Sequence, residues 1–441
     1  MRVRRCRRSA KRCSATPPDR CSERVARRSR YGRDRPDARR MCDGCAIERQ
    51  RGDGEQLIAH ARDRRPLGRR VETPSSRHAR CFEIARPNGS NAGCEEHRMK
   101  TYVWLTLLAI VGCSDNNGDH IVTRTDIVTN ATDPNLINAW GLAFNPAGTA
   151  WVSANGTGVS EVYDVTGAHV IPPVTIPGPL LATDPPATPS GQAFNGTTAF
   201  LGDTFIFVTE DGTIAGWQSA AGSTATLRVD HSDVNAVYKG VALGQATNGD
   251  ARLYAANFHG GTVDVFDGSY KLVQGGFVDP QLAAGFAPFN VAVVPGGVLV
   301  SYALQDADKH DDVAGAGNGF VDLYDGDGNL LSHLISGGEL NSPWGMTISP
   351  SNFSAAPNRL LVGNFGDGLI HLYDINNNDQ QASLRGTLNT TSSTPIAIDG
   401  LWALQFGPGA GSFASNILYF TAGPRMESQG VFGSLTSASS D

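Results

Sequence analysis

The chain has 441 residues and a formal net charge of −6, an average that hides two different compositions. Residues 1–98 carry 27 Lys and Arg against 13 Asp and Glu, whereas the remainder carries 10 against 30 and holds only one of the eight cysteines, Cys113. Binding to a phosphate backbone needs clustered Lys and Arg, so the acidic remainder predicts no nucleic-acid partner.

The first 98 residues lack the marks of a folded domain. The run RVRRCRRSAKRC is typical of a basic tail, and Cys42 and Cys45 form a C-x-x-C pair. There is no second Cys/His pair at zinc-site spacing and no hydrophobic periodicity. We therefore interpret residues 1–98 as disordered or not natively translated.

Residues 99–112 have the composition of an export signal. The run MKTYVWLTLLAIVGC combines a charged start with an apolar core, as signal peptides do, although a buried strand followed by a chance cysteine is the alternative. Its end resembles a bacterial lipobox. That resemblance implies acylation of Cys113 and an exported protein held in the bacterial cell envelope by its lipid anchor only. The polar run SDNNGD that follows Cys113 predicts a short flexible tether over residues 113–120.

Residues 121–436 contain six repeats. Each repeat has an anchor within a short apolar strand, and the anchors are spaced by 50, 49, 50, 55 and 58 residues. The anchors are Gly141, Gly191, Gly240, Asn290, Gly345 and Ala403. Two further β-branched or aromatic strands follow each anchor, separated by Gly, Asn and Asp turns.

A four-stranded unit repeating about every 50 residues is the pattern of a β-propeller. We therefore predict an all-β fold, a six-bladed β-propeller over 121–436 followed by a tail over 437–441. The run IVTRTDIVTN at 121–130 is expected to supply the outer strand that the last repeat lacks, which would close the ring between the two termini. A closed ring needs no partner copy, so we expect a monomer.

The sequence predicts a polar mouth at one end of the ring, where inner strands start and the loops between second and third strands cross. Amide and carboxylate oxygens gather there, and oxygen-rich sites suit calcium. The predicted calcium ligands are Glu210, Asn290, Asn341 and Asp399. Ordinary turn geometry is the alternative for each Asn and Asp beside a glycine.

Aromatic residues and one long loop mark the same end. Trp140, Trp344, Trp402 and His259 are expected to contact a substrate, with packing between blades as the alternative for the tryptophans. The fourth repeat carries a loop over 304–320, and long loops on a rigid scaffold often carry function.

Three residues are candidates for proton transfer, Asp306 and His310 of that loop and Asp399. A solvated acidic loop is the alternative. The body has no G-x-S-x-G, no H-E-x-x-H and no cysteine beyond Cys113, which argues against a serine hydrolase, a zinc protease and a cysteine nucleophile.

The runs INAWGLAF, ANFHGGTVDVFDG, QDADKHDDVAGAGNGFVDLYD and GNFGDG resemble a family of exported bacterial propellers without an assigned function. A looser, architectural resemblance is to the calcium-dependent six-bladed lactonases of the gluconolactonase, regucalcin and paraoxonase type. Those enzymes carry their metal ligands at the starts of the inner strands. Here the residues just before the anchors include Trp140, Lys239 and Trp344, and none of these positions holds a carboxylate.

Two functions fit these features. The first is a calcium-dependent hydrolase of lactones or small esters, such as acyl-homoserine or sugar lactones. The second is a non-catalytic envelope propeller that binds a glycan, a peptide or a protein partner at the same mouth. A cofactor-dependent oxidoreductase is a distant third, because no nucleotide or quinone motif is visible.

Overall fold

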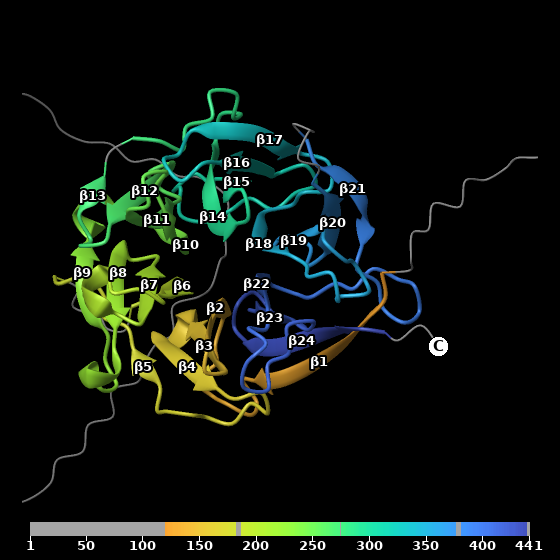
Figure 1. Ribbon diagram of the computed structural model, residues 1–441, viewed down its shortest axis with the longest axis horizontal. Coiled ribbons are helices and arrows are strands. Elements are labelled where there is room, and N and C mark those ends of the chain that lie inside the picture. The colour runs from red at the N-terminus through yellow and green to blue at the C-terminus, as the bar shows by residue number, and fades with distance from the viewer. Residues whose placement is uncertain (1–119, 182–186, 274, 376–380, 439–441) are drawn as a thin grey trace, which may run out of the picture. The chain divides into compact units, whose positions relative to one another are not determined.

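The computed structural model describes residues 120–181, 187–273, 275–375 and 381–438. Within these residues the chain forms six four-stranded antiparallel sheets arranged as blades around a central axis, which confirms the six-bladed propeller (Figure 1). The expectations for residues 1–98, for the signal at 99–112 and for Cys113 lie outside the described residues.

Blades 1 to 5 run from the axis to the rim in chain order, and blade 6 takes its outer strand from the start of the described chain. The inner strands are β2 (Ala139–Asn145), β6 (Pro189–Phe194), β10 (Tyr238–Gln245), β14 (Phe286–Val294), β18 (Pro343–Ile348) and β22 (Leu401–Phe406). The second strands are β3 (Thr149–Ala154), β7 (Phe205–Thr209), β11 (Ala251–Asn257), β15 (Gly297–Leu304), β19 (Leu360–Asn364) and β23 (Leu418–Ala422).

The third strands are β4 (Val159–Tyr163), β8 (Thr213–Trp217), β12 (Thr262–Asp267), β16 (Phe320–Tyr324), β20 (Ile370–Asp374) and β24 (Val431–Ser437). The outer strands are β5 (Val174–Thr175), β9 (Thr226–Asp230), β13 (Leu272–Val273), β17 (Leu330–Ser336), β21 (Ser383–Thr387) and β1 (Val122–Thr129). We number blade 1 from β2 to β5 and the following blades in chain order, so that blade 6 combines β22 to β24 with β1.

The ring closes as the sequence predicts. Strand β1 pairs antiparallel with β24, from Val122 opposite Ser437 to Thr129 opposite Val431 (Figure 1). This pairing gives the last blade its fourth strand and leaves β24 with partners on both sides, which removes a free sheet edge.

The anchors pack where inner strands of neighbouring blades converge. A Cβ atom on Gly141 would lie 2.4 Å from the carbonyl oxygen of Ser190, and one on Gly345 would lie 2.7 Å from that of Trp402. Only glycine allows backbones this close. All six inner strands also shift register against their second strands in their first residues. Such bulges bend a strand and re-aim its side chains.

The hydrophobic core lies mainly between adjacent blades. Between blades 1 and 2, the ring of Trp151 stacks on Phe205 with the centroids 3.9 Å apart. Since antiparallel strands alternate in direction, the start of each inner strand and the loop between second and third strands meet at one end of the ring. We call this end the mouth.

Candidate functional site

Ionisable side chains from four blades meet at the mouth. We call this set the mouth cluster; its members are Glu210, Lys239, His310, Asp311, Asp312 and Glu427. Lys239 lies on an inner strand, and the other members lie on loops between second and third strands. The propeller topology therefore gathers residues that are more than 200 positions apart in the sequence.

Lys239 is the buried cation of the cluster. Its side chain is 2% exposed, and its Nζ donates to Glu210 Oε1 and lies 3.3 Å from Asp311 Oδ1. Nζ also lies 5.2 Å from the ring centroid of Trp140, a cation–π contact. Burial alone would lower the pKa of Lys239, but the charges of Glu210 and Asp311 more than offset it and raise that pKa above its usual value. The ammonium group is therefore charged at neutral pH.

His310 and Asp311 form a pair at the exposed side of the cluster. Nδ1 of His310 lies 2.8 Å from Asp311 Oδ1. This hydrogen bond lowers the pKa of Asp311 to about 2 and raises that of His310. Asp306 shapes the turn beneath them, since its Oδ1 accepts the backbone N–H of His310 at 2.9 Å. Both members of the pair are accessible to solvent.

Glu427 lies on a strained loop between β23 and β24. Arg425, Met426 and Glu427 have φ values of 56°, 54° and 63°, three consecutive residues in the left-handed region that non-glycine residues rarely adopt. Asp399 holds this loop, because its Oδ2 accepts the N–H of Arg425 at 2.9 Å. Such strain is concentrated at functional sites.

The carboxyl group of Glu427 holds a proton near neutral pH. Burial, and then the negative charge of Glu210, raise its pKa to about 7. Burial also raises the pKa of Asp312, whose Oδ2 is buried without a hydrogen-bond partner among the described residues. Perturbed carboxyl groups beside a His–Asp pair are the composition expected of an acid–base site.

The predicted calcium ligands each make hydrogen bonds within the chain. Both carboxylate oxygens of Glu210 are bonded to side chains of the chain itself. Asn290 Oδ1 accepts the N–H of the next residue, Asn341 Oδ1 accepts a backbone N–H of the β15–β16 connection, and Asp399 Oδ2 accepts one from its neighbouring loop. The calcium assignment therefore remains a prediction.

The three tryptophans pack together at the floor of the mouth. The rings of Trp140 and Trp402 stack with centroids 3.7 Å apart, and Trp344 meets Trp402 edge-on at 5.9 Å. All three are at most 5% exposed, as expected for the packing alternative. The indole N–H groups of Trp140 and Trp344 are buried without an acceptor in the described part of the chain. His259 lies half-buried on the β11–β12 connection.

The structure thus joins His310 to the mouth cluster directly and gives Asp306 and Asp399 positioning roles. Sequence reasoning missed Lys239 and Glu427. Lys239 stands just before the anchor Gly240, where the sequence shows only that no acidic ligand is present. Glu427 belongs to the run GPRMESQG, the sixth of the loops between second and third strands, and that equivalence was the available signal.

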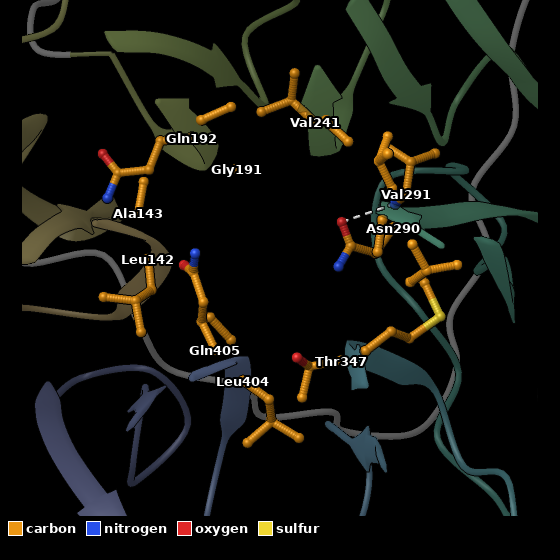
Figure 2. A pocket seen from close by; sticks show the side chains of 18 of the residues that line it. Leu142, Ala143, Gly191, Gln192, Val241, Asn290, Val291, Thr347, Leu404 and Gln405 are labelled. Atoms are coloured by element: carbon orange, nitrogen blue, oxygen red, sulfur yellow. Dashed lines mark hydrogen bonds between the residues drawn. The ribbon is translucent and has the colours of Figure 1, made fainter. Parts of the chain in front are cut away.

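A central channel lies on the other side of the tryptophans. Its cavity of about 500 Å³ is lined by the inner strands, and Trp344 forms part of its wall. Figure 2 shows Gln192, Asn290, Thr347 and Gln405 around it. None of the described residues lining the channel is ionisable, so this cavity suits an uncharged ligand rather than acid–base chemistry.

Two other groups of acidic residues and histidine lie between blades. The blade 1 cluster consists of Asp133, Glu161 and His169, and the blade 4 cluster of Asp279, Asp322 and His333. Burial raises the pKa of Glu161 to about 7 and that of Asp322 to about 6. Within the described residues, these two clusters and the group Glu210, His310 and Asp311 have the composition to hold a metal ion.

The fold and the site together define a six-bladed propeller with a charged, partly buried mouth. No protein-family model matches the chain. It is 26% identical over 334 residues to an uncharacterized protein of Acanthamoeba polyphaga mimivirus, covering 72% of this chain and 84% of the relative. A second uncharacterized mimivirus protein is 28% identical over 322 residues, covering 69% and 76%. These relatives are viral and give no support to the expected bacterial family.

Several solved propellers are similar in fold. Virginiamycin B lyase from Staphylococcus aureus is 11% identical with a TM-score of 0.40, over 72% of this chain and 99% of the lyase. The calcium-binding protein regucalcin from Agrobacterium tumefaciens is 12% identical with a TM-score of 0.40, over 69% and 92%. Aldose sugar dehydrogenase from Escherichia coli is 11% identical with a TM-score of 0.43, over 72% and 100%. No activity is inferred from similarities this distant.

The described residues include no helix that is long and apolar enough to span a membrane. Their helices are four 3₁₀ segments of three residues each, Asn155–Thr157, Phe200–Gly202, Ser219–Ala221 and Ser232–Val234.

Proposed function

We propose that the chain is a hydrolase of small esters or lactones, such as acyl-homoserine or sugar lactones, and that the mouth cluster is its active site. The observation that carries the proposal is the accessible His310–Asp311 pair in one cluster with a buried ammonium and with Glu427, whose pKa is about 7. Ester hydrolysis needs a general base and a general acid, and His310 and Glu427 are the side chains of this cluster that can supply them.

The geometry divides the roles between two side chains. With the His310 Nδ1–H donated to Asp311, the lone pair of Nε2 is free to accept a proton from a water molecule that attacks the ester carbonyl carbon. The C–O bond to the leaving alcohol then breaks, and the carboxyl group of Glu427 donates its proton to the departing oxygen. Lys239 is a positioning residue, since it holds Glu210 and Asp311 in place.

This mechanism needs no metal, in contrast to the calcium-dependent hydrolase that the sequence suggested. The predicted calcium ligands use their oxygens in separate hydrogen bonds, and the ammonium of Lys239 already neutralises Glu210. Chelation therefore separates the two versions of the hydrolase.

The test is hydrolysis of a panel of acyl-homoserine and sugar lactones by the purified chain, with added calcium and then with chelator. We expect turnover in both conditions and at least about a 100-fold loss in His310→Gln and Glu427→Gln. Asp250→Asn, an exposed residue of the β10–β11 turn at the opposite end of the ring, is the matched control. Loss of turnover on chelation, restored by calcium, would show that the calcium hypothesis is right.

A non-catalytic binding propeller is the second candidate, and the uncharged channel favours it. A cavity of about 500 Å³ lined by aliphatic side chains and the amide groups of Gln192, Asn290 and Gln405 suits a neutral glycan segment better than a charged one. Absence of turnover with all lactones, together with glycan binding that Gln405→Leu weakens, would favour this function over the hydrolase. A peptide or protein partner is the other ligand class to be screened.

We also propose that the protein is exported, anchored to an envelope membrane through Cys113 and monomeric. The support is the apolar run ending in Cys113 and the closure of the ring by its own termini. On expression in a bacterium, Cys113→Ser is expected to move the protein from the membrane fraction to the soluble fraction. Light scattering of the soluble form then gives its oligomeric state.

A further inference from the structure

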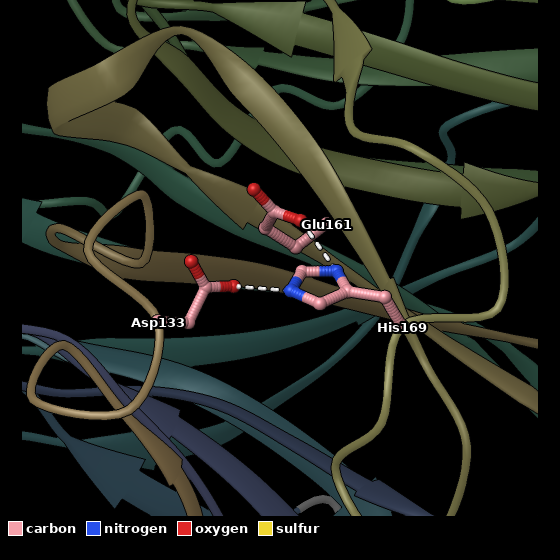
Figure 3. Close-up of side chains that lie close together, drawn as sticks. All are labelled: Asp133, Glu161 and His169. Carbon is pink, nitrogen blue, oxygen red and sulfur yellow. Dashed lines mark ion pairs between the residues drawn. The ribbon is translucent and has the colours of Figure 1, made fainter.

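The blade 1 cluster lies away from the mouth cluster, beside the seam where the ring closes. Asp133 belongs to the connection from β1 to β2, Glu161 lies on β4, and His169 precedes β5. His169 Nε2 lies 3.2 Å from Asp133 Oδ2, and its Nδ1 lies 3.2 Å from Glu161 Oε2. Figure 3 shows the imidazole ring between the two carboxylates.

The two carboxylates differ in how the chain satisfies them. Asp133 accepts hydrogen bonds from the Tyr163 hydroxyl at 2.6 Å and from the N–H of Asn135 at 3.0 Å. Glu161 is fully buried, and neither of its oxygens has a hydrogen-bond partner in the described part of the chain. A buried carboxylate without hydrogen bonds is costly, and its presence in a native fold calls for a further partner.

His169 alone does not supply that partner. Its side chain is 45% exposed, so water competes for its ring nitrogens. It contributes at most one positive charge against two buried carboxylates. Because Glu161 faces the ring and the ring is open to solvent on one side, a cation has a way into the cluster.

We propose that Asp133, Glu161 and His169 bind a divalent transition-metal ion, with Zn²⁺ as the ion whose preferences they match best. One ligand atom from each residue lies within 4.8 Å of the other two. Imidazole favours zinc over calcium and magnesium, and carboxylate oxygens complete such sites. One nitrogen of His169 would turn to the ion, and water from the exposed side would fill the fourth position.

Such an ion would stabilise the closure of the ring. Asp133 lies on the segment that enters blade 1 from β1, and Tyr163, which donates to Asp133, stacks on Phe432 of β24 with ring centroids 6.0 Å apart. A ligand that binds only the folded chain raises its stability in proportion to the logarithm of the ligand concentration. Zinc is therefore expected to raise the melting temperature of the whole propeller.

The blade 4 cluster supplies a matched control. Asp322 lies at the position of β16 that corresponds to Glu161 on β4, and its two oxygens contact His333 Nδ1 at 3.2 Å and the Tyr324 hydroxyl at 3.4 Å. The atom without a hydrogen bond there is a ring nitrogen, Nε2 of His333, rather than a carboxylate oxygen. At this strand position the chain thus supplies hydrogen bonds to the carboxylate in blade 4 but not to the carboxylate in blade 1.

The experiment is a calorimetric titration of the full chain with Zn²⁺ after dialysis against chelator, with the melting temperature as a second readout. We expect the wild type and Asp322→Asn to bind zinc and to melt at a higher temperature with it. Glu161→Gln is expected to lose one equivalent of zinc or at least about 100-fold in affinity, together with the shift in melting temperature.

His169→Ala guards against misfolding of the Glu161 variant. The ring of His169 is half exposed, so its removal should leave the fold intact while weakening zinc binding as Glu161→Gln does. Absence of zinc binding by the wild type, or unchanged binding in both blade 1 variants, would overturn the proposal. Equal displacement of zinc by Ca²⁺ at the same concentration would also overturn it, because the ion would then not be a transition metal.

Discussion

The mouth cluster and the blade 1 cluster both bury carboxylates, but only the mouth cluster contains an ammonium group. At the mouth, Lys239 is bonded to Glu210 and lies within 3.3 Å of Asp311. In blade 1, the ion-pair partner of Glu161 is the half-exposed ring of His169. The difference teaches that one propeller can stabilise buried negative charge with a cation of its own in one place and require a bound ion in another.

The blade 4 cluster shows a third way of stabilising a buried carboxylate. Asp322 is stabilised by a histidine and a tyrosine, and Tyr302 in turn bonds the hydroxyl of Tyr324 at 2.6 Å. Asp264, at the corresponding position of β12, accepts hydrogen bonds from Asn257 and Tyr238. Hydrogen bonds therefore replace a cation in blades 3 and 4, which makes blade 1 the exception among these related positions.

The largest expected effect comes from removing the cation of the mouth. Lys239→Met leaves Glu210, whose side chain is 10% exposed, without a charged partner. Breaking a buried ion pair from one side costs about 3–5 kcal/mol. We expect a loss of that size in the free energy of unfolding, measured with urea.

The double variant Lys239→Met/Glu210→Gln is the control for this prediction. It removes both charges, so most of the lost stability should return. If Lys239→Met lowers the free energy of unfolding by less than about 1 kcal/mol, the prediction is wrong, because the cation would then not be what stabilises the mouth.

The proton on Glu427 gives the next largest effect, and it depends on pH. The pKa of Glu427 is raised from 4.5 to about 7, so the folded state holds a proton that the unfolded state releases. Stability from this group is therefore present below pH 4.5 and falls as pH rises toward 7. Glu427→Gln removes the dependence and should be more stable than the wild type at pH 8 by on the order of 2 kcal/mol.

Thermal melting of both proteins between pH 4 and pH 8 checks this expectation. Curves that stay parallel across the range would show that Glu427 does not carry the proton at the mouth. The activity assay then has to be interpreted with another acid, such as Asp312.

A matched pair of variants compares the blade 1 and blade 4 clusters. In the presence of chelator, Glu161→Leu removes an unsatisfied buried carboxylate, whereas Asp322→Leu removes the acceptor that Tyr324 and His333 share. We expect Asp322→Leu to be the less stable by about 1–2 kcal/mol. Urea unfolding measures the gap, and equal losses would mean that the two clusters are equivalent without metal.

The sequence predicts the fold well because propeller repeats are local. The six anchors, the strand runs after them and the closure by residues 121–130 depend on glycine placement and alternation, which can be read over a few residues. The four-stranded sheets confirm all of these. The close approach at Gly141 explains why the anchors are recognisable, since only a small residue fits there.

The site is less predictable because it depends on the conformation of loops. The sequence places His310 and Glu210 at the mouth but does not reveal that the ammonium group of Lys239 bonds to Glu210. Nor does it predict three consecutive left-handed residues in the loop that carries Glu427, because non-glycine residues seldom adopt that backbone. The blade 1 cluster joins residues from three segments, and only the packed blades bring them together.

The smallest expected effect on stability is also the sharpest test of function. Asp311 raises the pKa of His310, so their pairing stabilises the folded chain at acidic pH and is lost as pH rises through that pKa. Both side chains are exposed, so His310→Ala should change the free energy of unfolding by less than about 0.5 kcal/mol. If lactone turnover falls at least about 100-fold in that same variant, the exposed side of the mouth serves chemistry and its buried side serves stability. A variant that instead unfolds would mean that the histidine belongs to the same stabilising network as Lys239.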